Sequence, residues 1–220
     1  VRSSIAEADD IIALWIEAHK DSKNIIVSTD SDFNQLVSPL TSIYNGMNNT
    51  ITTVNGYYDE KDKPVIDKKT GMPKSAPDPE YMLFEKCIRG DSSDNVFSAY
   101  PKARTKKIIE AFNDRHNQGF VWNNFMLAKW TDHLGNENQV KDCYERNRQL
   151  IDLTKQPEEV KVDVLKQIAD SQKNKGIDQV GIRFMKFCAK YGLNKLSEQP
   201  TDHAQYLNAG YPGVESKANN

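Results

Sequence analysis

The stretch NIIVSTDSDF, residues 24–33, decides the fold, because a short apolar run passes within it directly into an acidic loop. Residues 24–28 are continuous and rich in β-branched side chains, which is typical of a strand covered on both faces. Asp30 and Asp32 follow at the carboxyl end of this strand, and Phe33 to Leu36 predict a short helix. Ligands of α/β sheets gather in the crevice beyond the carboxyl ends of the strands. The stretch therefore predicts an α/β fold with two acids at the rim of its sheet.

A second group of acids precedes this unit, at the start of a predicted helix. Between Ala6 and Lys20, apolar residues recur at helical spacing and form one face. Glu7, Asp9 and Asp10 crowd the first turn of this helix, where the helix dipole favours negative charge.

A third acidic segment follows a predicted helix that ends at Gly90. Asp91 and Asp94 are three residues apart, so one turn places both carboxylates on the same side. Taken singly, each acidic segment has an ordinary explanation as a helix cap or a turn. Their occurrence around one β-loop-α unit favours a shared crevice, where carboxylates repel one another unless cations neutralise them. Oxygen ligands suit hard cations such as Mg²⁺, and two such ions are the apparatus of phosphodiester hydrolysis.

The remaining patterns predict a small sheet followed by helices. We expect β-structure between Ser42 and Tyr58, with a hairpin turning at Asn55-Gly56. The polar residues 59–79 predict an exposed loop or a second hairpin turning at Thr70-Gly71. Helices are then expected at Tyr81–Ile88, Thr105–Phe112, Val121–Trp130, Asn138–Asp152, Pro157–Ser171 and Val180–Tyr191. The predicted organisation is an α/β core over residues 1–78, a helical region over 79–197 and a polar, partly disordered tail over 198–220.

Composition excludes several classes of protein. The 220 residues contain no apolar run of the roughly 20 residues that a membrane span needs, and no signal-peptide pattern. Three cysteines without a CxxC pair indicate neither a disulfide framework nor a zinc site, and favour the reducing cytoplasm. The net charge of −2 does not by itself indicate a nucleic-acid-binding protein. Because the chain runs from Val1 directly into its first predicted helix, we expect it to be the carboxyl-terminal portion of a longer protein.

Taken together, the three acidic segments resemble a known set of signature blocks. EADDIIA (residues 7–13), STDSDFNQL (28–36) and RGDSSDNV (89–96) are similar to those of the structure-specific 5′-nucleases, the family of flap endonucleases and 5′-3′ exonucleases. Within this family the chain most resembles phage RNase H, and the similarity covers roughly residues 5 to 195. The resemblance implies an α/β fold with a partial parallel, PIN-like sheet and an acidic metal crevice, followed by an α-helical DNA-binding region of helix-loop-helix type.

The resemblance also implies roles for the acids. Asp9 and Asp30 would lie nearest a first metal ion, and Asp32, Asp91 and Asp94 would surround a second. Two Mg²⁺ ions, which Mn²⁺ is expected to replace, would serve hydrolysis of phosphodiester bonds, removing RNA primers and 5′ flaps during phage-type DNA replication in a bacterial host cytoplasm. The full metal set is Glu7, Asp9, Asp10, Asp30, Asp32, Asp91 and Asp94, all of them catalytic except Asp10, which would support the others.

A basic segment follows the third acidic block. The resemblance implies that it contacts the phosphates of DNA or of an RNA/DNA duplex with a 5′ end or flap, through Lys102, Arg104, Thr105, Lys106 and Lys107. By itself such a segment is more often a solvated lysine face, and its position after the third acidic block favours the DNA-binding interpretation. Ser98 to Pro101 stand where cellular relatives carry a Gly-rich hairpin, so a potassium-binding loop is not expected. A monomer is expected, with a replication clamp or a single-strand-binding protein as further partners, and no membrane.

Two alternatives remain open at this stage. The family takes further carboxylates and a basic helical arch from a region before the present Val1, so the chain alone is expected to be weakly active or inactive. It would then act as a catalytically incompetent DNA-binding module for branched or nicked duplex. The other alternative is a structural protein stabilised by Ca²⁺ or Mg²⁺, without affinity for DNA.

Overall fold

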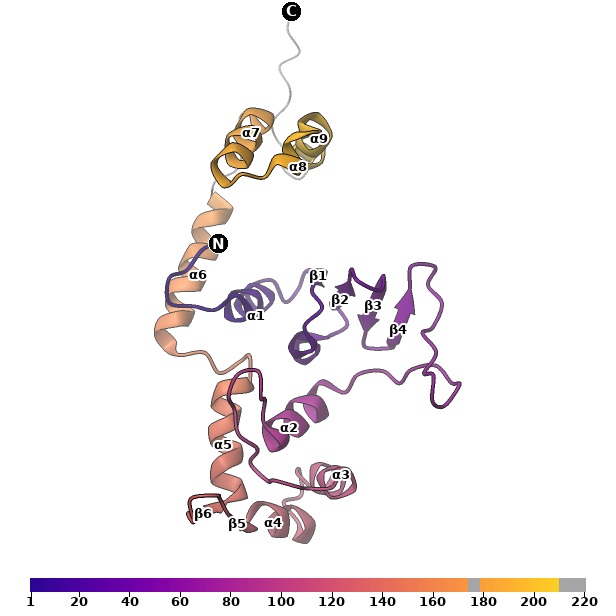
Figure 1. Cartoon of the computed structure of the whole chain (residues 1–220), viewed down its shortest axis with the longest axis vertical. Helices are drawn as coiled ribbons and strands as arrows, with labels where there is room; N and C mark the ends of the chain where they lie inside the picture. Colours follow the sequence, from indigo (N-terminus) through magenta and orange to yellow (C-terminus); the bar gives the residue numbers. More distant parts are fainter. Residues whose placement is uncertain (174–178, 210–220) are drawn as a thin grey trace, which may run out of the picture. The chain divides into compact units, whose positions relative to one another are not determined.

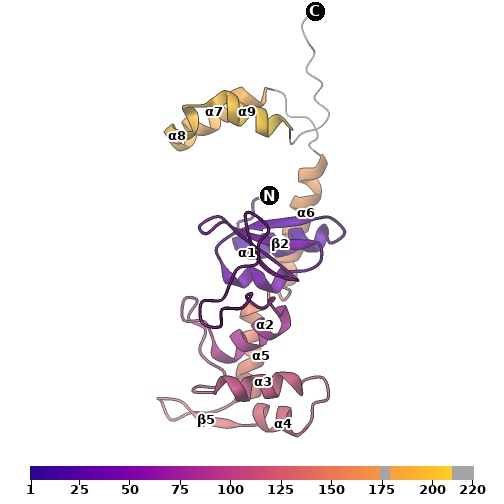
Figure 2. The same cartoon turned by 90° about the vertical axis from the view of Figure 1, so that its right-hand side faces the viewer.

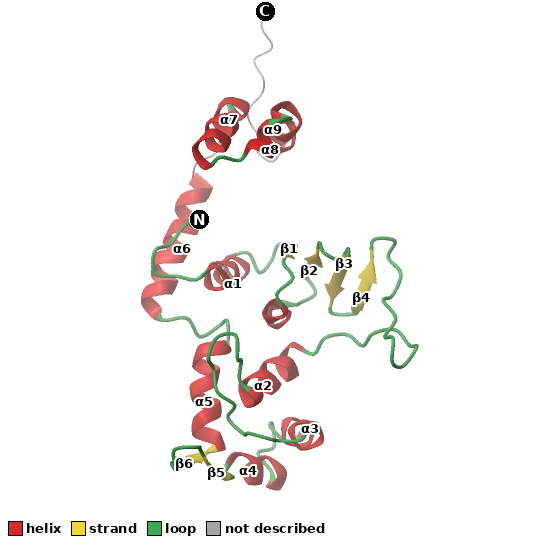
Figure 3. Ribbon diagram, viewed as in Figure 1, coloured by secondary structure: helices red, strands yellow, loops and turns green. Residues whose placement is uncertain are grey.

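A four-stranded sheet organises the first part of the chain (Figures 1 and 3). Strand β1 (Asn24–Val27) pairs in parallel with β2 (Thr41–Asn45), and β3 (Thr50–Thr53) and β4 (Gly56–Asp59) continue the sheet in antiparallel fashion. The strand order is β1-β2-β3-β4. The predicted α/β class with a partial parallel sheet is confirmed, and a single parallel pair, β1 with β2, provides its parallel part.

This computed structural model describes residues 1–173 and 179–209, which fall into two compact units. The first unit comprises residues 2–165, and the second begins at residue 166. The boundary expected between residues 78 and 79 lies inside the first unit.

One face of the sheet is covered by helices. Helix α1 (Ala8–Ala18) and the 3₁₀ helix η1 (Ser31–Leu36) pack on the side where Ile26 and Ile43 point. The buried residues Phe33 and Val37 complete this small core. Because α1 and η1 lie on this face, the acids at their first turns come to one edge of the sheet.

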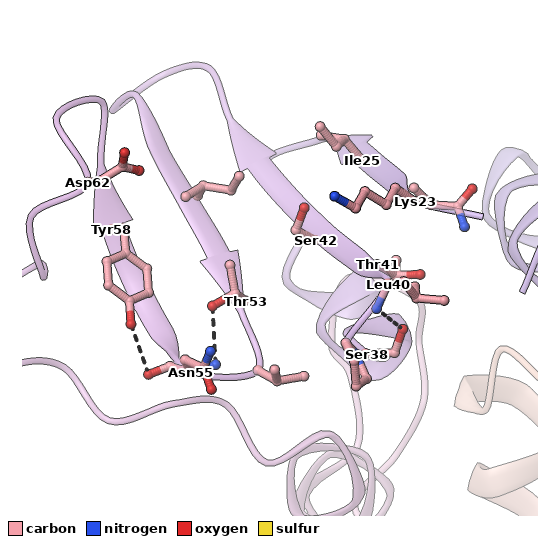
Figure 4. A pocket seen from close by; sticks show the side chains of 14 residues that line it. Lys23, Ile25, Ser38, Leu40, Thr41, Ser42, Thr53, Asn55, Tyr58 and Asp62 are labelled. Atoms are coloured by element: carbon pink, nitrogen blue, oxygen red, sulfur yellow. Dashed lines mark hydrogen bonds between the residues drawn. The ribbon is translucent and has the colours of Figure 1, made fainter. Parts of the chain in front are cut away.

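The opposite face of β1 is open, which corrects the expectation of a strand covered on both sides. Ile25 is 64% exposed and Val27 is 73% exposed, because α1 and η1 both use the other face. Figure 4 shows this open face, where Ile25, Ser42, Thr53 and Tyr58 line a shallow depression of about 500 Å³.

The two predicted turns of the sheet region are both present, and one is shifted. The first hairpin turns at Val54 and Asn55 instead of Asn55-Gly56, and Gly56 already pairs with Thr53. The Thr53 hydroxyl accepts the N–H of Asn55 at 3.1 Å, which stabilises this earlier turn. The second turn lies at the expected Thr70-Gly71, where the Gly71 N–H donates to the Asp67 carbonyl at 2.8 Å.

Helices dominate the rest of the first unit, around a second core. They are α2 (Pro79–Arg89), α3 (Thr105–Asn113), α4 (Phe120–Met126) and α5 (Val140–Ile151). Figures 1 and 2 show α5 running past α2, and α3 lies against α4. The interior of this core is formed by Phe84, Ile88, Ile108, Phe112, Phe125 and Val140.

The helix expected over Val121–Trp130 ends early. Residues after Met126 turn into a hairpin of β5 (Lys129–Thr131) and β6 (Glu137–Gln139). The Asp132 carboxylate accepts the N–H groups of Leu134 and Asn136, both at 2.9 Å, and so holds the turn of this hairpin. Trp130 nevertheless packs on the core, and its indole N–H donates to the Ala99 carbonyl at 2.9 Å.

The remaining helices are α6 (Glu158–Lys173), α7 (Val180–Tyr191), α8 (Asn194–Ser197) and α9 (Pro200–Ala209). Helix α9 lies within the segment predicted as a polar tail from residue 198, and Pro200 stands at its favourable first helical position. Residues 210–220 of the predicted tail lie outside the described residues. None of the described helices is long and apolar enough to cross a membrane.

The cysteines are free and buried. Cys87 and Cys143 belong to the first unit, and Cys188 belongs to the second. Burial raises the pKa of the Cys87 thiol to about 12, and the nearby negative charge of Asp152 acts in the same direction.

Candidate metal centre

The loop after strand β1 holds its two acids through local hydrogen bonds. Asp30 caps η1, and its carboxylate accepts the backbone N–H of Asp32 at 2.9 Å. The Asp30 N–H donates in turn to the Ser28 hydroxyl at 3.0 Å. Asp30 is thus turned to its own helix start, while the side chain of Asp32 reaches helix α2.

The loop after helix α2 is shaped by one glycine. Gly90 has a φ of +78°, and a Cβ added there would lie 2.3 Å from the Val96 carbonyl oxygen. Asp91 and Val96 exchange backbone hydrogen bonds of 2.8 and 2.7 Å, which close the loop. Asp91 also accepts the N–H of Ser93 at 2.9 Å. This tight loop presents Asp91 and Asp94 on the side of Asp32.

Three carboxylates meet between the two loops. Ligand atoms of Asp32, Asp91 and Asp94 all lie within 4.8 Å of one another. Among the described residues, this is the group of acids that could hold a metal ion, and Glu7, Asp9, Asp10 and Asp30 lie outside it. All three residues were expected from the sequence to surround one ion.

A lysine that the sequence did not point to lies within this group. The Lys86 ammonium, carried by α2, bonds to the carboxylate of Asp32 and lies 2.5 Å from Asp91 Oδ2. Burial disfavours the charge on Lys86, but its two carboxylate partners outweigh burial and raise its pKa. Conversely, the hydrogen bond from Lys86 holds the pKa of Asp91 well below its usual range. In the sequence, the only indication of this role was the position of Lys86, one helical turn before Gly90 and the third acidic segment.

The acids of α1 act on the same edge through their charge. Glu7 stands before the first residue of α1, and its N–H donates to the Asp10 carboxylate at 3.1 Å. Burial raises the pKa of Asp9, and the negative charges of Asp30 and Asp32 raise it further. Asp9 therefore interacts electrostatically with both acids that follow β1, as expected if all three line a common crevice.

Replacing Asp9 with asparagine is expected to raise the melting temperature of the metal-free protein at pH 7. Because the folded protein holds the Asp9 proton more tightly than the unfolded chain does, stability rises as pH falls through the raised pKa. Above that pKa the ionised carboxylate costs stability, and the amide removes the cost. Thermal melts in EDTA should show the gain at pH 7 and equal melting below pH 3.8, the ordinary pKa. Equal melting at pH 7 would contradict the prediction.

A buried amide fixes the acidic loop from behind. Asn147 of α5 is fully buried, and its Nδ2 donates to the carbonyls of Cys87 at 2.9 Å and Phe97 at 2.7 Å. These carbonyls lie just before and just after the loop that carries Asp91 and Asp94. Asn147 therefore joins the two ends of that loop to α5.

Replacing Asn147 with leucine is expected to lower the free energy of unfolding by about 2–4 kcal/mol, because both carbonyls lose their donor. Urea titration at pH 7 measures the change. Replacing the exposed Asn136 with leucine provides the matched control: its side-chain amide donates to the Asp132 carboxylate at the hairpin turn, at 3.0 Å, and its loss should cost less than about 1 kcal/mol. Equal losses for the two variants would remove the special role assigned to Asn147.

The five basic-segment residues differ in their surroundings. Lys102, in the turn before α3, and Arg104 and Lys106, at the start of α3, are exposed, and Lys106 Nζ lies 3.9 Å from Glu110 Oε1. Thr105 accepts a hydrogen bond of 2.8 Å from Arg89, and Lys107 donates to the Tyr100 hydroxyl at 2.9 Å. Lys102, Arg104 and Lys106 are therefore the members most available to a phosphate backbone.

The fold has solved counterparts from bacteriophage T5. The structure is similar to the T5 D15 protein co-crystallised with metal ions, with a TM-score of 0.50 and 16% identity over 77% of this chain and 61% of that chain. A variant of T5 5′-exonuclease has a TM-score of 0.48 and 17% identity, over 74% of this chain and 65% of that chain. A variant D15 flap endonuclease, in a pseudo-enzyme–product complex with DNA and metal ions, has a TM-score of 0.47 and 17% identity, over 74% of this chain and 59% of that chain. No family model and no curated protein matches the sequence.

The chain thus spans 59–65% of the length of these structures. The D15 protein shares the fold of this chain, which agrees with the fold predicted from the three acidic blocks.

Proposed function

We propose, from this shared fold, that the chain carries a metal centre and DNA-contacting helices of a 5′-nuclease. The reaction would be hydrolysis of phosphodiester bonds in DNA or RNA/DNA duplexes at a free 5′ end or flap, as in primer removal. One observation carries the proposal: Asp32 converges with Asp91 and Asp94, from a distant segment, to within 4.8 Å on a fold shared with the D15 protein.

The chemistry of the acids fits a hard divalent cation. The donors are carboxylate oxygens, which suit Mg²⁺ and Mn²⁺, and a positive charge already lies among them in the form of Lys86. Asp32, Asp91 and Asp94 would hold one ion, while Asp9 and Asp30 provide carboxylates for a second, with Glu7 and Asp10 at the same helix start. When bound, such ions supply Lewis-acid activation of water and charge neutralisation at the scissile phosphate.

Residues around the acidic group hold its carboxylates in position without a metal ion. Gly90 and Asn147 fix the loop that presents Asp91 and Asp94, and Asp30 fixes the start of η1 that presents Asp32. Pre-formed ligands bind a cation without the cost of first ordering a loop.

The proposal is tested with a 5′-labelled flap substrate, incubated with the chain and Mg²⁺. Short labelled products that disappear with EDTA would support it. Intact substrate, under conditions where the chain binds the flap, would overturn the nuclease assignment of this chain.

Replacing Lys102 and Lys106 together with alanine is expected to weaken binding to duplex DNA without preference for sequence. Each lost phosphate contact should reduce the slope of log affinity against log salt by about 1. Fluorescence anisotropy from 50 to 200 mM salt measures the slope, in Ca²⁺ to prevent cleavage. Replacing Lys68 and Lys69, which lie in the loop after β4, removes the same charge elsewhere and should leave the slope near that of the original protein.

A second candidate is a DNA-binding module that no longer cleaves. It is favoured by the ion pairs of Lys86, which partly neutralise the acids within the protein itself. It predicts flap binding that survives substitution of the acids, with no cleavage in Mg²⁺ or Mn²⁺.

A further inference from the structure

Lys86 differs from the other lysines that form ion pairs in the described part of the chain. Its side chain is 24% exposed, and the side chains of its partners Asp32 and Asp91 are 18% and 13% exposed. By contrast, the ion pairs of Lys106 with Glu110 and of Lys129 with Glu137 lie on the surface. A shielded ion pair is less weakened by solvent and salt than an exposed one.

The ammonium and a metal ion would need the same oxygen atoms. Asp91 Oδ1 already accepts hydrogen bonds from the N–H and the hydroxyl of Ser93. Its other oxygen, Oδ2, is the one that faces Lys86 at 2.5 Å. Lys86 also bonds to Oδ1 of Asp32. One oxygen atom of each carboxylate, Oδ1 of Asp32 and Oδ2 of Asp91, therefore already bonds to the lysine.

We propose that Lys86 is a tethered counter-ion of the acidic group, which holds Asp32 and Asp91 together in the metal-free protein and is displaced from Asp91 Oδ2 when a divalent cation binds. Lys86 is thus a positioning residue that lowers the affinity for the cation while keeping its ligands in place. The inference rests on the proposed function only in assuming that Asp32, Asp91 and Asp94 take a divalent cation.

The test compares Mn²⁺ affinity of the original chain and of Lys86→Met, by isothermal titration calorimetry without nucleic acid. Methionine keeps an unbranched side chain but has no charge, so the cation no longer competes with an ammonium. The affinity of Lys86→Met should rise about tenfold, the effect of losing one competing charge-assisted hydrogen bond. In EDTA the variant should melt at a lower temperature, because its carboxylates then repel one another, and Mn²⁺ should raise its melting temperature more than that of the original chain.

Two further variants serve as controls. One keeps the positive charge at position 86, and the other removes a lysine ion pair elsewhere in the chain. Lys86→Arg retains a cation that can bond to both carboxylates, and should bind Mn²⁺ no more tightly than the original chain. Lys129→Met removes the exposed pair with Glu137, at 2.6 Å, and should leave Mn²⁺ affinity unchanged. If Lys86→Met does not fold in EDTA, Lys86→Gln takes its place, with the same expected gain in affinity.

The outcomes distinguish this inference from the proposed function. If the original chain and its Lys86 variants bind no Mn²⁺, the proposed metal centre fails. If the original chain binds Mn²⁺ and the neutral variants bind it equally or more weakly, the counter-ion role is overturned while the metal centre stands.

Discussion

Alanine at Gly90 is expected to destabilise the first unit by about 2–6 kcal/mol and to weaken its binding of divalent cations. Two costs combine. The backbone at Gly90, with φ +78° and ψ −177°, lies in a region that glycine alone adopts readily, and this strain costs about 1–3 kcal/mol. The added Cβ would also lie 2.3 Å from the Val96 carbonyl oxygen and 2.7 Å from the nitrogen of Ser98, which are backbone atoms that cannot rotate away. Relieving that overlap costs a further 1–3 kcal/mol or so.

The loop must shift to accept the new methyl group, so Asp91 and Asp94 move relative to Asp32. Urea unfolding measures the stability loss, and Mn²⁺ titration measures the loss of binding. Gly135→Ala is the matched control, because Gly135 also has a positive φ, +88°, but nothing lies within 4 Å of its added Cβ. It should show only the cost of strain and unchanged Mn²⁺ affinity. Equal effects of the two substitutions would show that overlap at Gly90 has no consequence.

Asparagine at Asp91 is expected to lower Mn²⁺ affinity at least about 100-fold, and metal-dependent flap cleavage by a similar factor. Residues that only support metal ligands already change affinity about 10- to 100-fold, so loss of a ligand's charge should exceed that range. The substitution also removes a partner of Lys86, leaving its ammonium with Asp32 alone. Calorimetry without nucleic acid measures the first effect, and the 5′-labelled flap measures the second.

Asp67→Asn serves as the control for Asp91→Asn. Asp67 likewise accepts backbone N–H groups in a tight turn, from Lys69 at 2.8 Å and Thr70 at 3.0 Å, but lies outside the acidic group. It should lose some stability and keep full affinity for Mn²⁺. Retained affinity in Asp91→Asn would remove Asp91 from the proposed ligands.

The sequence predicted those features that depend on neighbouring residues. The β-loop-α unit around Asp30 could be predicted because an apolar run, a polar loop and a helix start follow one another directly. The turn at Gly71 and the end of α7 at Gly192, with its φ of +65°, could be predicted for the same reason, because neighbouring residues determine them. The hairpin of Trp130 was missed, because a helical spacing of large apolar residues continues past Met126 and conceals the turn that Asp132 stabilises.

Tertiary features were harder to predict. The positions of the acidic segments around one β-loop-α unit favoured a shared crevice, but the grouping of Asp32 with Asp91 and Asp94 could be inferred only by matching all three acidic blocks to a known family. Lys86 could not be inferred in this way, because one lysine on a helix most often faces solvent. The open face of β1 was missed because the apolar residues Ile25 and Val27 look the same in sequence whether covered or exposed.

The buried thiols make the two units separately observable. Cys87 and Cys143 in the first unit, and Cys188 in the second, are shielded from solvent, so an alkylating reagent reaches each one only when its surroundings open. Mass spectrometry of the modified peptides over time would then report how often each unit opens under native conditions. An added surface cysteine, for example at the exposed Leu134, could also carry a fluorescent dye while the natural thiols stay unlabelled.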